Sequence, residues 1–193
     1  MSKILQFKIT LKRTNPKIWR RIQVEDSMTF HDLHLVIQHA MGWMNYHLHQ
    51  FIYDRNNYIG DPELLEMDNI ANSKEIPLSE FFNKPKMQME YEYDFGDGWY
   101  HELVLEKIIE PAIGKFYPAC TAGEKSCPPE DCGSIPGFYN MLEIIKNKKR
   151  PEYKEMMEWL GEDYDPDEFD MDQVNEFLND YKSIDEQFDG NDF

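Results

Sequence analysis

Apolar and polar residues alternate at the start of the chain. In the segment 3–13, every second position from residue 5 is apolar: Leu5, Phe7, Ile9 and Leu11. A period of two is typical of a strand with one buried face. Residues 18–24 read as a second strand, and Asn15-Pro16 supplies the turn between the two. The chain is therefore expected to begin with a β-hairpin.

The period changes to that of a helix after Thr29. The Thr29 side chain can cap the first free amides, and Asp32 stands three residues further on, as in a capping box. Apolar residues then recur at helical spacing: Leu33, Ile37, Ala40 and Met41. Gly42 is a natural end for this helix. Residues 47–54 predict a third strand.

Two further strand-like runs, residues 87–95 and 100–109, meet at Gly96-Asp97-Gly98. A two-residue turn at Asp97-Gly98 would place the apolar face of the first run on the same side as glutamates of the second. We therefore predict a shifted pairing, with Tyr91 opposite Leu105 and Tyr93 opposite Leu103. This pairing requires a three-residue connection or a bulge with a glycine at positive φ.

The remainder of the chain is a Pro-, Gly- and Cys-bearing loop over residues 110–133, followed by three amphipathic helices. The predicted fold class is α+β: a mostly antiparallel sheet with a β-β-α-β start, a long hairpin and a C-terminal layer of three helices. We expect one domain over residues 1–193. It would comprise a sheet-rich body (1–109), the loop (110–133) and an acidic helical section (134–193).

Composition and charge narrow the function classes. Hydrophobic residues make up 41% and charged residues 30% of the chain, which is typical of a globular protein. Residues 152–193 hold 16 acids and 2 bases, out of a net charge of -17 for the chain. Nucleic-acid binding is disfavoured because it needs clustered Lys and Arg. The acidic section could instead dock a basic partner.

No targeting or membrane segment is visible in the sequence. No apolar run approaches the roughly 20 residues of a spanning helix, and the N-terminus lacks a continuous signal-peptide core. We therefore expect a cytoplasmic location and no membrane partner.

Candidate chemistry gathers around the long hairpin. Asp94, Asp97 and His101 at its turn are the candidate catalytic residues. His47 and His49 lie two positions apart in the third strand, about 6.5 to 7 Å along it, which suits two ligands of one metal. His101 or Asp97 would supply a third ligand. The alternative is that all three histidines are packed, hydrogen-bonded core side chains.

A second candidate metal set comprises Cys120, Cys127 and Cys132. Three thiolates are one short of a structural zinc set, so a histidine would have to complete it. The alternative is ordinary thiols. Three cysteines so close together, in a chain without a secretion signal, do not indicate a disulfide framework.

Several stretches resemble one known family: residues 16–51, YEYDFGDGWYHELVLEKI (91–108), CPPEDCGSIPGFYNML (127–142) and YDPDEFDMDQVN (164–175). Together they resemble the plasmid Orf-three-like family, named for an open reading frame on a root-inducing plasmid. The resemblance implies an association with mobile elements and no established reaction. Some members carry a transposon-passenger label suggesting a resolvase, but this chain shows no recombinase signature. Ser134 stands where members usually have a glycine, and it could cap the following helix.

Two main hypotheses of function follow. The first is a non-enzymatic binding or interaction module, associated with mobile elements, for an unknown protein or small ligand. Its candidate binding residues are Trp43, His47, His49, Phe95, Trp99 and Tyr100. The second is a metal-dependent enzyme of hydrolase type, in which zinc would be held by a His/Asp cluster. A concave cluster of histidines and hairpin aspartates would favour the enzyme, whereas packed histidines would favour the module.

Overall fold

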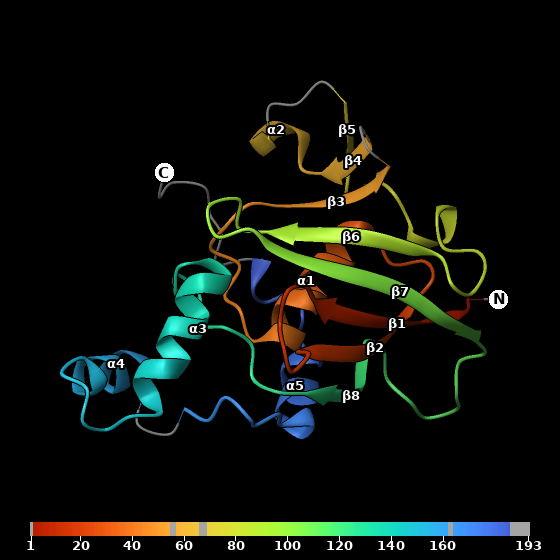
Figure 1. Ribbon diagram of the computed structural model, residues 1–193. Helices are drawn as coiled ribbons and strands as arrows, with labels where there is room; N and C mark the ends of the chain where they lie inside the picture. The colour runs from red at the N-terminus through yellow and green to blue at the C-terminus, as the bar shows by residue number, and fades with distance from the viewer. Residues whose placement is uncertain (1, 55–56, 66–68, 162–163, 186–193) are drawn as a thin grey trace.

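The computed structural model describes residues 2–54, 57–65, 69–161 and 164–185, and within these ranges eight strands form one sheet. The strands are β1 (Ile4–Leu11), β2 (Trp19–Glu25), β3 (His49–Asp54), β4 (Asn57–Gly60), β5 (Ile70–Asn72), β6 (Gln88–Tyr93), β7 (Trp99–Ile109) and β8 (Ala119–Glu124). Their order across the sheet is β5-β4-β3-β6-β7-β1-β2-β8 (Figure 1). All neighbours pair antiparallel except β4 and β5, which are parallel.

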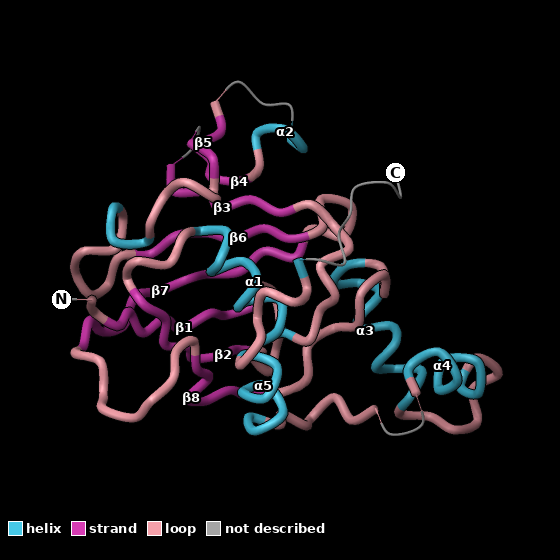
Figure 2. The backbone as a smooth tube through the Cα atoms, turned by 180° about the vertical axis from the view of Figure 1, so that it is seen from behind, coloured by secondary structure: helices cyan, strands magenta, loops and turns pink. Residues whose placement is uncertain are grey.

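The helices are α1 (Phe30–Met41), α2 (Pro62–Leu65), α3 (Ser134–Ile145), α4 (Tyr153–Leu160) and α5 (Met171–Leu178), with a 3-10 turn at Leu78–Glu80. Figure 2 shows α1 and α5 against one face of the sheet. Helix α5 contacts both α1 and β8, whereas α3 contacts α4. This arrangement confirms the predicted α+β class. No helix of the described ranges is long and apolar enough to cross a membrane.

The two faces of the sheet differ in polarity, as the alternation in β1 predicts. Leu5, Phe7, Ile9 and Leu11 are all buried beneath the helices. The opposite face carries ion pairs such as Arg21–Glu106, with 2.6 Å between Nε and Oε2. Covering one face lets the sheet bury apolar side chains, each stabilising the fold by about 1.5–3 kcal/mol, while the other face stays hydrated.

Helix α1 begins and ends as its sequence indicates. Thr29 and Asp32 form a capping box, in which the Asp32 amide donates to Thr29 Oγ1 at 3.1 Å and the Thr29 amide donates to Asp32 Oδ2 at 2.9 Å. Gly42 ends the helix with φ 86°, a left-handed conformation in which other residues are strained. The caps fix which face of α1 meets the sheet.

The register of the long hairpin differs from the prediction. Tyr91 pairs with His101 and Tyr93 with Trp99, so β6 is shifted along β7, although the same side chains still face the core. Strand pairing stops at Tyr93 because the Asp94 amide donates instead to Leu48 O, at 2.9 Å. The connection is therefore residues 94–98, longer than expected. Gly98 does have the predicted positive φ, at 66°.

Three short strands were not expected from the sequence. Strands β4 and β5 lie between the predicted strands 47–54 and 87–95, where no strand was predicted, and β8 lies in the predicted Cys/Pro loop. β8 is an edge strand, and the Asn175 side chain of α5 bonds both its Cys120 amide (2.8 Å) and its Cys120 carbonyl (2.9 Å). An amide side chain thereby satisfies backbone groups that an edge leaves open.

The start of α3 gives a stability prediction. Ser134 adopts φ 65°, and the N-cap residue is Gly133, which has no capping side chain. The expected capping role of Ser134 is therefore wrong. A side chain in the left-handed region costs about 1–2 kcal/mol, so Ser134→Gly should stabilise the fold by about 0.5–1 kcal/mol after the extra freedom of an unfolded glycine is subtracted.

Urea unfolding of wild type and Ser134→Gly measures this difference. Ser134→Ala is the matched control, because it keeps the Cβ atom and should leave stability nearly unchanged. A glycine variant less stable than wild type would contradict the strain argument.

Candidate functional site

Three segments meet where β6 ends and β7 begins, at the left of the sheet in Figure 1: residues 43–48, the turn 94–98 and the loop 127–133. Besides the bond from Asp94 to Leu48, Glu130 accepts the Met44 amide at 2.9 Å and the Tyr93 hydroxyl. The Gly133 amide donates to Asp97 Oδ2 at 3.2 Å. These bonds bring segments far apart in the chain to one place.

At this junction His47, Asp94 and Asp131 form a group that we call the hairpin-end cluster. One ligand atom from each lies within 4.8 Å of the other two. His47 Nε2 lies 3.2 Å from Asp131 Oδ1 and 3.8 Å from Asp94 Oδ2. Among the described residues, this is the group of His, Cys and acidic side chains whose geometry could hold a metal ion.

The distances between the ligand atoms of the cluster fit the binding of one metal ion better than a hydrogen-bonded ion pair. Although it lies close to two carboxylates, His47 Nε2 makes no hydrogen bond of acceptable geometry. Ligand atoms bonded at about 2.1 Å to a tetrahedral metal lie about 3.4 Å apart, and the two measured distances lie on either side of that value. A plain ion pair would instead align an N–H with one carboxylate oxygen.

Local backbone geometry aims Asp94 at His47. Asp94 has φ 55°, and its Oδ1 accepts the amides of Gly96 (2.9 Å) and Asp97 (3.2 Å). Its other carboxylate oxygen is thereby left to face His47. Asp94 is buried and held, whereas the Asp131 side chain is 71% exposed. The carboxylate of Asp94 is thus held in place, whereas that of Asp131 is free to adjust its position.

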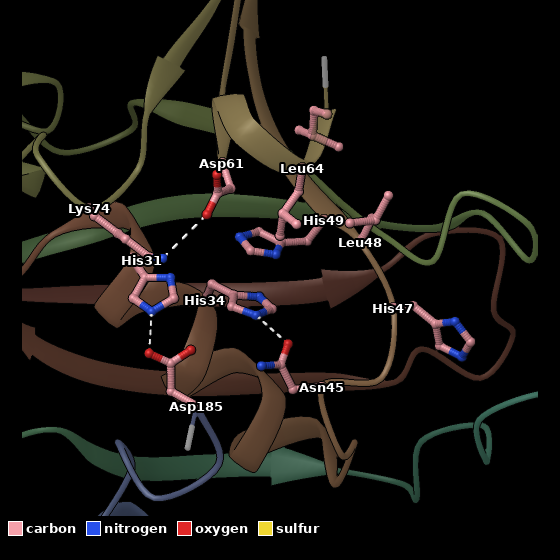
Figure 3. Close-up of a pocket in the computed structure, with 11 residues that line it drawn as sticks. His31, His34, Asn45, His47, Leu48, His49, Asp61, Leu64, Lys74 and Asp185 are labelled. Carbon is pink, nitrogen blue, oxygen red and sulfur yellow. Dashed lines mark hydrogen bonds and ion pairs between the residues drawn. The ribbon is translucent and has the colours of Figure 1, made fainter. Parts of the chain in front are cut away.

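The predicted set of His47, His49 and His101 does not form. His47 precedes β3, and Figure 3 shows its ring well apart from His49. The His49 ring instead stacks on His34, with 3.4 Å between ring centroids and 4° between planes. His101 is 0% exposed and lies between Trp43 and Tyr91. His49 and His101 are therefore packed side chains, as in the core alternative, but they are not fully hydrogen-bonded: His49 Nε2 and both ring nitrogens of His101 have no hydrogen-bond partner among the described residues. His101 is removed from any surface reaction.

Burial also changes the expected recognition surface. Trp43 and Trp99 are 2% and 1% exposed, so both belong to the core rather than to a surface, and Tyr100 is partly covered. Phe95 is exposed as expected. Two neighbours that the sequence did not single out are exposed as well, Met44 and Tyr46. The buried indole N–H of Trp43 is satisfied, because it donates to Pro128 O at 2.9 Å.

The three cysteines do not converge either. Cys127 Sγ lies against Met41 Sδ at 3.1 Å, while Cys120 Sγ contacts Ala122 O at 3.5 Å. Burial raises the pKa of the Cys127 thiol to about 11 and that of Cys132 to about 12, and it also raises the pKa of Cys120. All three thiols remain protonated at neutral pH. They do not form the predicted zinc set, and the ordinary-thiol alternative describes them.

Some residues of the site were not among the candidates predicted from the sequence. Asp131 and Glu130 lie in the CPPEDCG stretch, where an acidic pair among turn-forming residues was the available signal. His34 and Gln38 share the apolar stripe of α1 and both turn inward. His34 Nε2 donates to Asn45 Oδ1 at 2.7 Å, and Tyr91 Oη lies 2.8 Å from His34 Nδ1. A polar pair on an apolar stripe signals such an internal network.

Comparison with known proteins gives one consistent answer. Residues 3–173 match the model of a family described as plasmid pRiA4b ORF-3-like protein. The uncharacterized protein y4hQ of Sinorhizobium fredii (strain NBRC 101917 / NGR234) is 31% identical over 182 residues, which cover 93% of each chain. A crystal structure of a protein of unknown function, MM3350 from Methanosarcina mazei Go1, is 39% identical with a TM-score of 0.81. It covers 90% of this chain and 98% of its own. None of these descriptions assigns a reaction.

The buried histidines predict an acid-sensitive fold. Burial lowers the pKa of His49 and of His101 to about 3, and it lowers that of His34 well below 6.5. The unfolded chain binds protons at these sites below about pH 6.5, whereas the folded chain does not. The free energy of unfolding should therefore fall as the pH drops below about 6.5, with a limiting slope of about 4 kcal/mol per pH unit for three protons.

Urea unfolding between about pH 7 and 4.5 tests this, because exposed carboxylates titrate mostly below that window. His101→Phe should reduce the slope by about a quarter to a third, since it removes one of these imidazoles and burial also lowers the pKa of a fourth histidine, His39. A flat profile for wild type would show that the histidines are not linked to folding.

Proposed function

This chain belongs to the plasmid pRiA4b ORF-3-like protein family, and from that premise we propose that it is a non-enzymatic binding module that takes up a divalent cation at the hairpin-end cluster. The observation that carries the proposal is the convergence of His47, Asp94 and Asp131 from three segments that lie far apart in the chain. An association with mobile elements and a cytoplasmic location are part of the same proposal.

The donor set favours a metal that accepts both nitrogen and oxygen. One imidazole and two carboxylates suit Zn²⁺ or Mn²⁺ better than Mg²⁺, which prefers oxygen donors and keeps its waters. The protein supplies three ligands, so at least one position remains for an oxygen donor of a partner. Exposed Met44, Tyr46 and Phe95 lie on the same two segments as His47 and Asp94 and would contact that partner.

A binding role is favoured over catalysis because the three candidate catalytic residues do not lie together in one site. His101 is sealed in the core, and Asp97 is engaged by the Gly133 amide. Asp94 lies in the cluster itself. No imidazole other than that of His47 belongs to the cluster, so no second histidine stands ready to move a proton at the ion.

The test is isothermal titration of metal-stripped protein with Zn²⁺. Wild type should bind one Zn²⁺ per chain, and both His47→Gln and Asp131→Asn should weaken binding about tenfold or more, because each removes one of three ligands. Asp131 is exposed, so its variant should fold normally.

Asp180→Asn is the matched control, since it removes an exposed carboxylate of the acidic section without touching the cluster. If Zn²⁺ binds equally to wild type, Asp131→Asn and Asp180→Asn, the acidic surface rather than the cluster holds the metal, and the proposal fails.

The second candidate function is a metal-dependent hydrolase. One observation favours it: a cation held by three protein ligands keeps an open position, as in catalytic zinc sites, where bound water becomes a nucleophile. Hydrolysis of 4-nitrophenyl acetate and of bis(4-nitrophenyl) phosphate by the Zn²⁺-loaded protein measures this activity. Turnover that exceeds free Zn²⁺ and disappears in Asp131→Asn would replace the module with the enzyme, whereas rates equal to those of free Zn²⁺ would exclude hydrolysis of these esters.

A further inference from the structure

A groove lies beside α3, and no residue of the hairpin-end cluster belongs to its walls. It has a volume of about 200 Å³ and runs between α3, the turn that joins β1 to β2, and residues 166–167. An apolar cavity of about 150 Å³ is already large enough for benzene, so the groove can take an aromatic or a branched aliphatic side chain. Its apolar lining comprises Pro16, Ile18, Phe138, Leu142, Ile145 and Pro166.

The apolar arc of α3 is wider than the part that the fold buries. Met141 and Ile144 are buried. Leu142 and Ile145, each one position further along the helix, are only half-buried, and both line the groove. Consecutive residues of a helix point about 100° apart, so the two pairs lie on different sides of α3. An apolar side that stays partly open within a polar surrounding indicates a site of interaction.

Hydrogen bonds hold the walls of the groove in place. The Asn15 amide of the β1–β2 turn donates to the Tyr139 hydroxyl of α3 at 2.7 Å. On the other wall, the Ser126 amide donates to Pro166 O at 3.2 Å. The groove therefore exists before any partner arrives, and binding does not have to order its walls.

The rim of the groove is basic, although the net charge of the chain is -17. Residues 146–150, which follow α3, hold four bases and no acid: Lys146, Lys148, Lys149 and Arg150. Lys146 itself lines the groove. On the opposite wall, the exposed Lys17 follows Pro16 directly. Cations thus flank the apolar lining from two sides.

The acids near the groove do not cancel this charge. Asp167 pairs with Lys125 at 2.7 Å, and Glu143 pairs with Lys146 at 2.8 Å. Lys17, Lys148 and Lys149 are exposed and make no ion pair within the described ranges. Three lysines therefore remain in excess around the groove. An excess of one sign favours a partner of the opposite sign.

We propose that this groove docks an acidic, amphipathic peptide segment of a partner protein. An aromatic or aliphatic side chain of the segment enters between Leu142 and Ile145, and carboxylates on either side of it face Lys17, Lys148 and Lys149. A peptide fits better than a small organic acid because the unpaired lysines are spread along the rim, outside the apolar lining. The site goes beyond the proposed metal function and shares no residue with it.

The probe is a fluorescein-labelled synthetic peptide, acetyl-Asp-Asp-Phe-Asp-Asp-Leu-Asp-Asp-amide. Its fluorescence anisotropy is measured during titration with the full chain, in the presence of EDTA so that metal binding plays no part. We expect saturable binding with a dissociation constant on the order of 10–100 μM. A peptide with serine in place of Phe and Leu should bind about tenfold more weakly, because it lacks the apolar anchors.

The double variant Lys148→Glu, Lys149→Glu tests the basic rim. It should bind the probe about tenfold more weakly at low salt, and the difference should shrink as salt screens the charges. Lys84→Glu, Lys107→Glu is the matched control, since it changes the net charge equally at exposed lysines elsewhere. The control should stay within about twofold of wild type. All four lysines are exposed, so both variants should fold.

Ile145→Ser tests the apolar lining, and it should weaken binding about fivefold or more, because it removes a contact of the anchor. Three results would overturn the proposal: no saturable rise in anisotropy, equal affinity of the two double variants, or equal affinity of the Phe/Leu and serine peptides. Tighter binding of a single-stranded oligodeoxynucleotide of similar charge would overturn it as well, because the rim lysines would then serve nucleic acid.

Discussion

The hydroxyl of Tyr93 holds together the end of the sheet on which the candidate site depends. Tyr93 is the last residue of β6, and its hydroxyl donates to Glu130 and accepts the Tyr46 amide at 3.0 Å. One buried phenol thus ties three segments that are far apart in the sequence. Burial and the neighbouring Glu130 carboxylate raise the pKa of Tyr93, so the phenol stays protonated and able to donate. His47 and Asp131 come together because the segments that carry them are fastened to this hydroxyl.

Behind this junction, the core is polar as well as apolar. His34, Gln38, Asn45 and Tyr91 satisfy one another: Gln38 donates to Tyr91 Oη at 3.0 Å, and the Asn45 amide donates to Gln38 Oε1 at 3.1 Å. In a low-dielectric interior such a network is strong when complete and costly when incomplete. It fixes the position of α1 over β6, and with it the position of the stacked His34 and His49 rings.

The acidic C-terminal section contributes to the same architecture through particular contacts rather than through its net charge. Asn175 covers the edge of β8, while Asp185 pairs with His31 of α1, with 2.9 Å between His31 Nε2 and Asp185 Oδ2. The Tyr181 hydroxyl donates to Asp32 at 3.0 Å, next to the capping box of α1. The section therefore supports α1 from outside, while many of its carboxylates remain exposed to solvent.

Local patterns were enough to determine much of the fold. The alternation around Phe7, the capping box at Thr29 and the glycine at residue 42 depend on neighbours in the chain, so the sequence alone placed β1 and α1. The three C-terminal helices follow from apolar stripes in the same way. The sequence also predicted which side chains of the long hairpin face the core. Side chains alternate between the two faces of a strand, so only two assignments were possible.

What the tertiary structure decided depends on partners distant in sequence. The hairpin register shifted because the Asp94 amide bonds Leu48 rather than β7, and β8 forms because β2 and Asn175 complete its hydrogen bonds. Of the hairpin-end cluster, the sequence identified His47 and Asp94 but not Asp131, whose loop reaches them only after folding. The sequence could not show that the His49 ring turns inward onto His34. Residues two apart share a face only within a strand, and β3 begins at His49, so His47 lies outside it and its side chain points elsewhere.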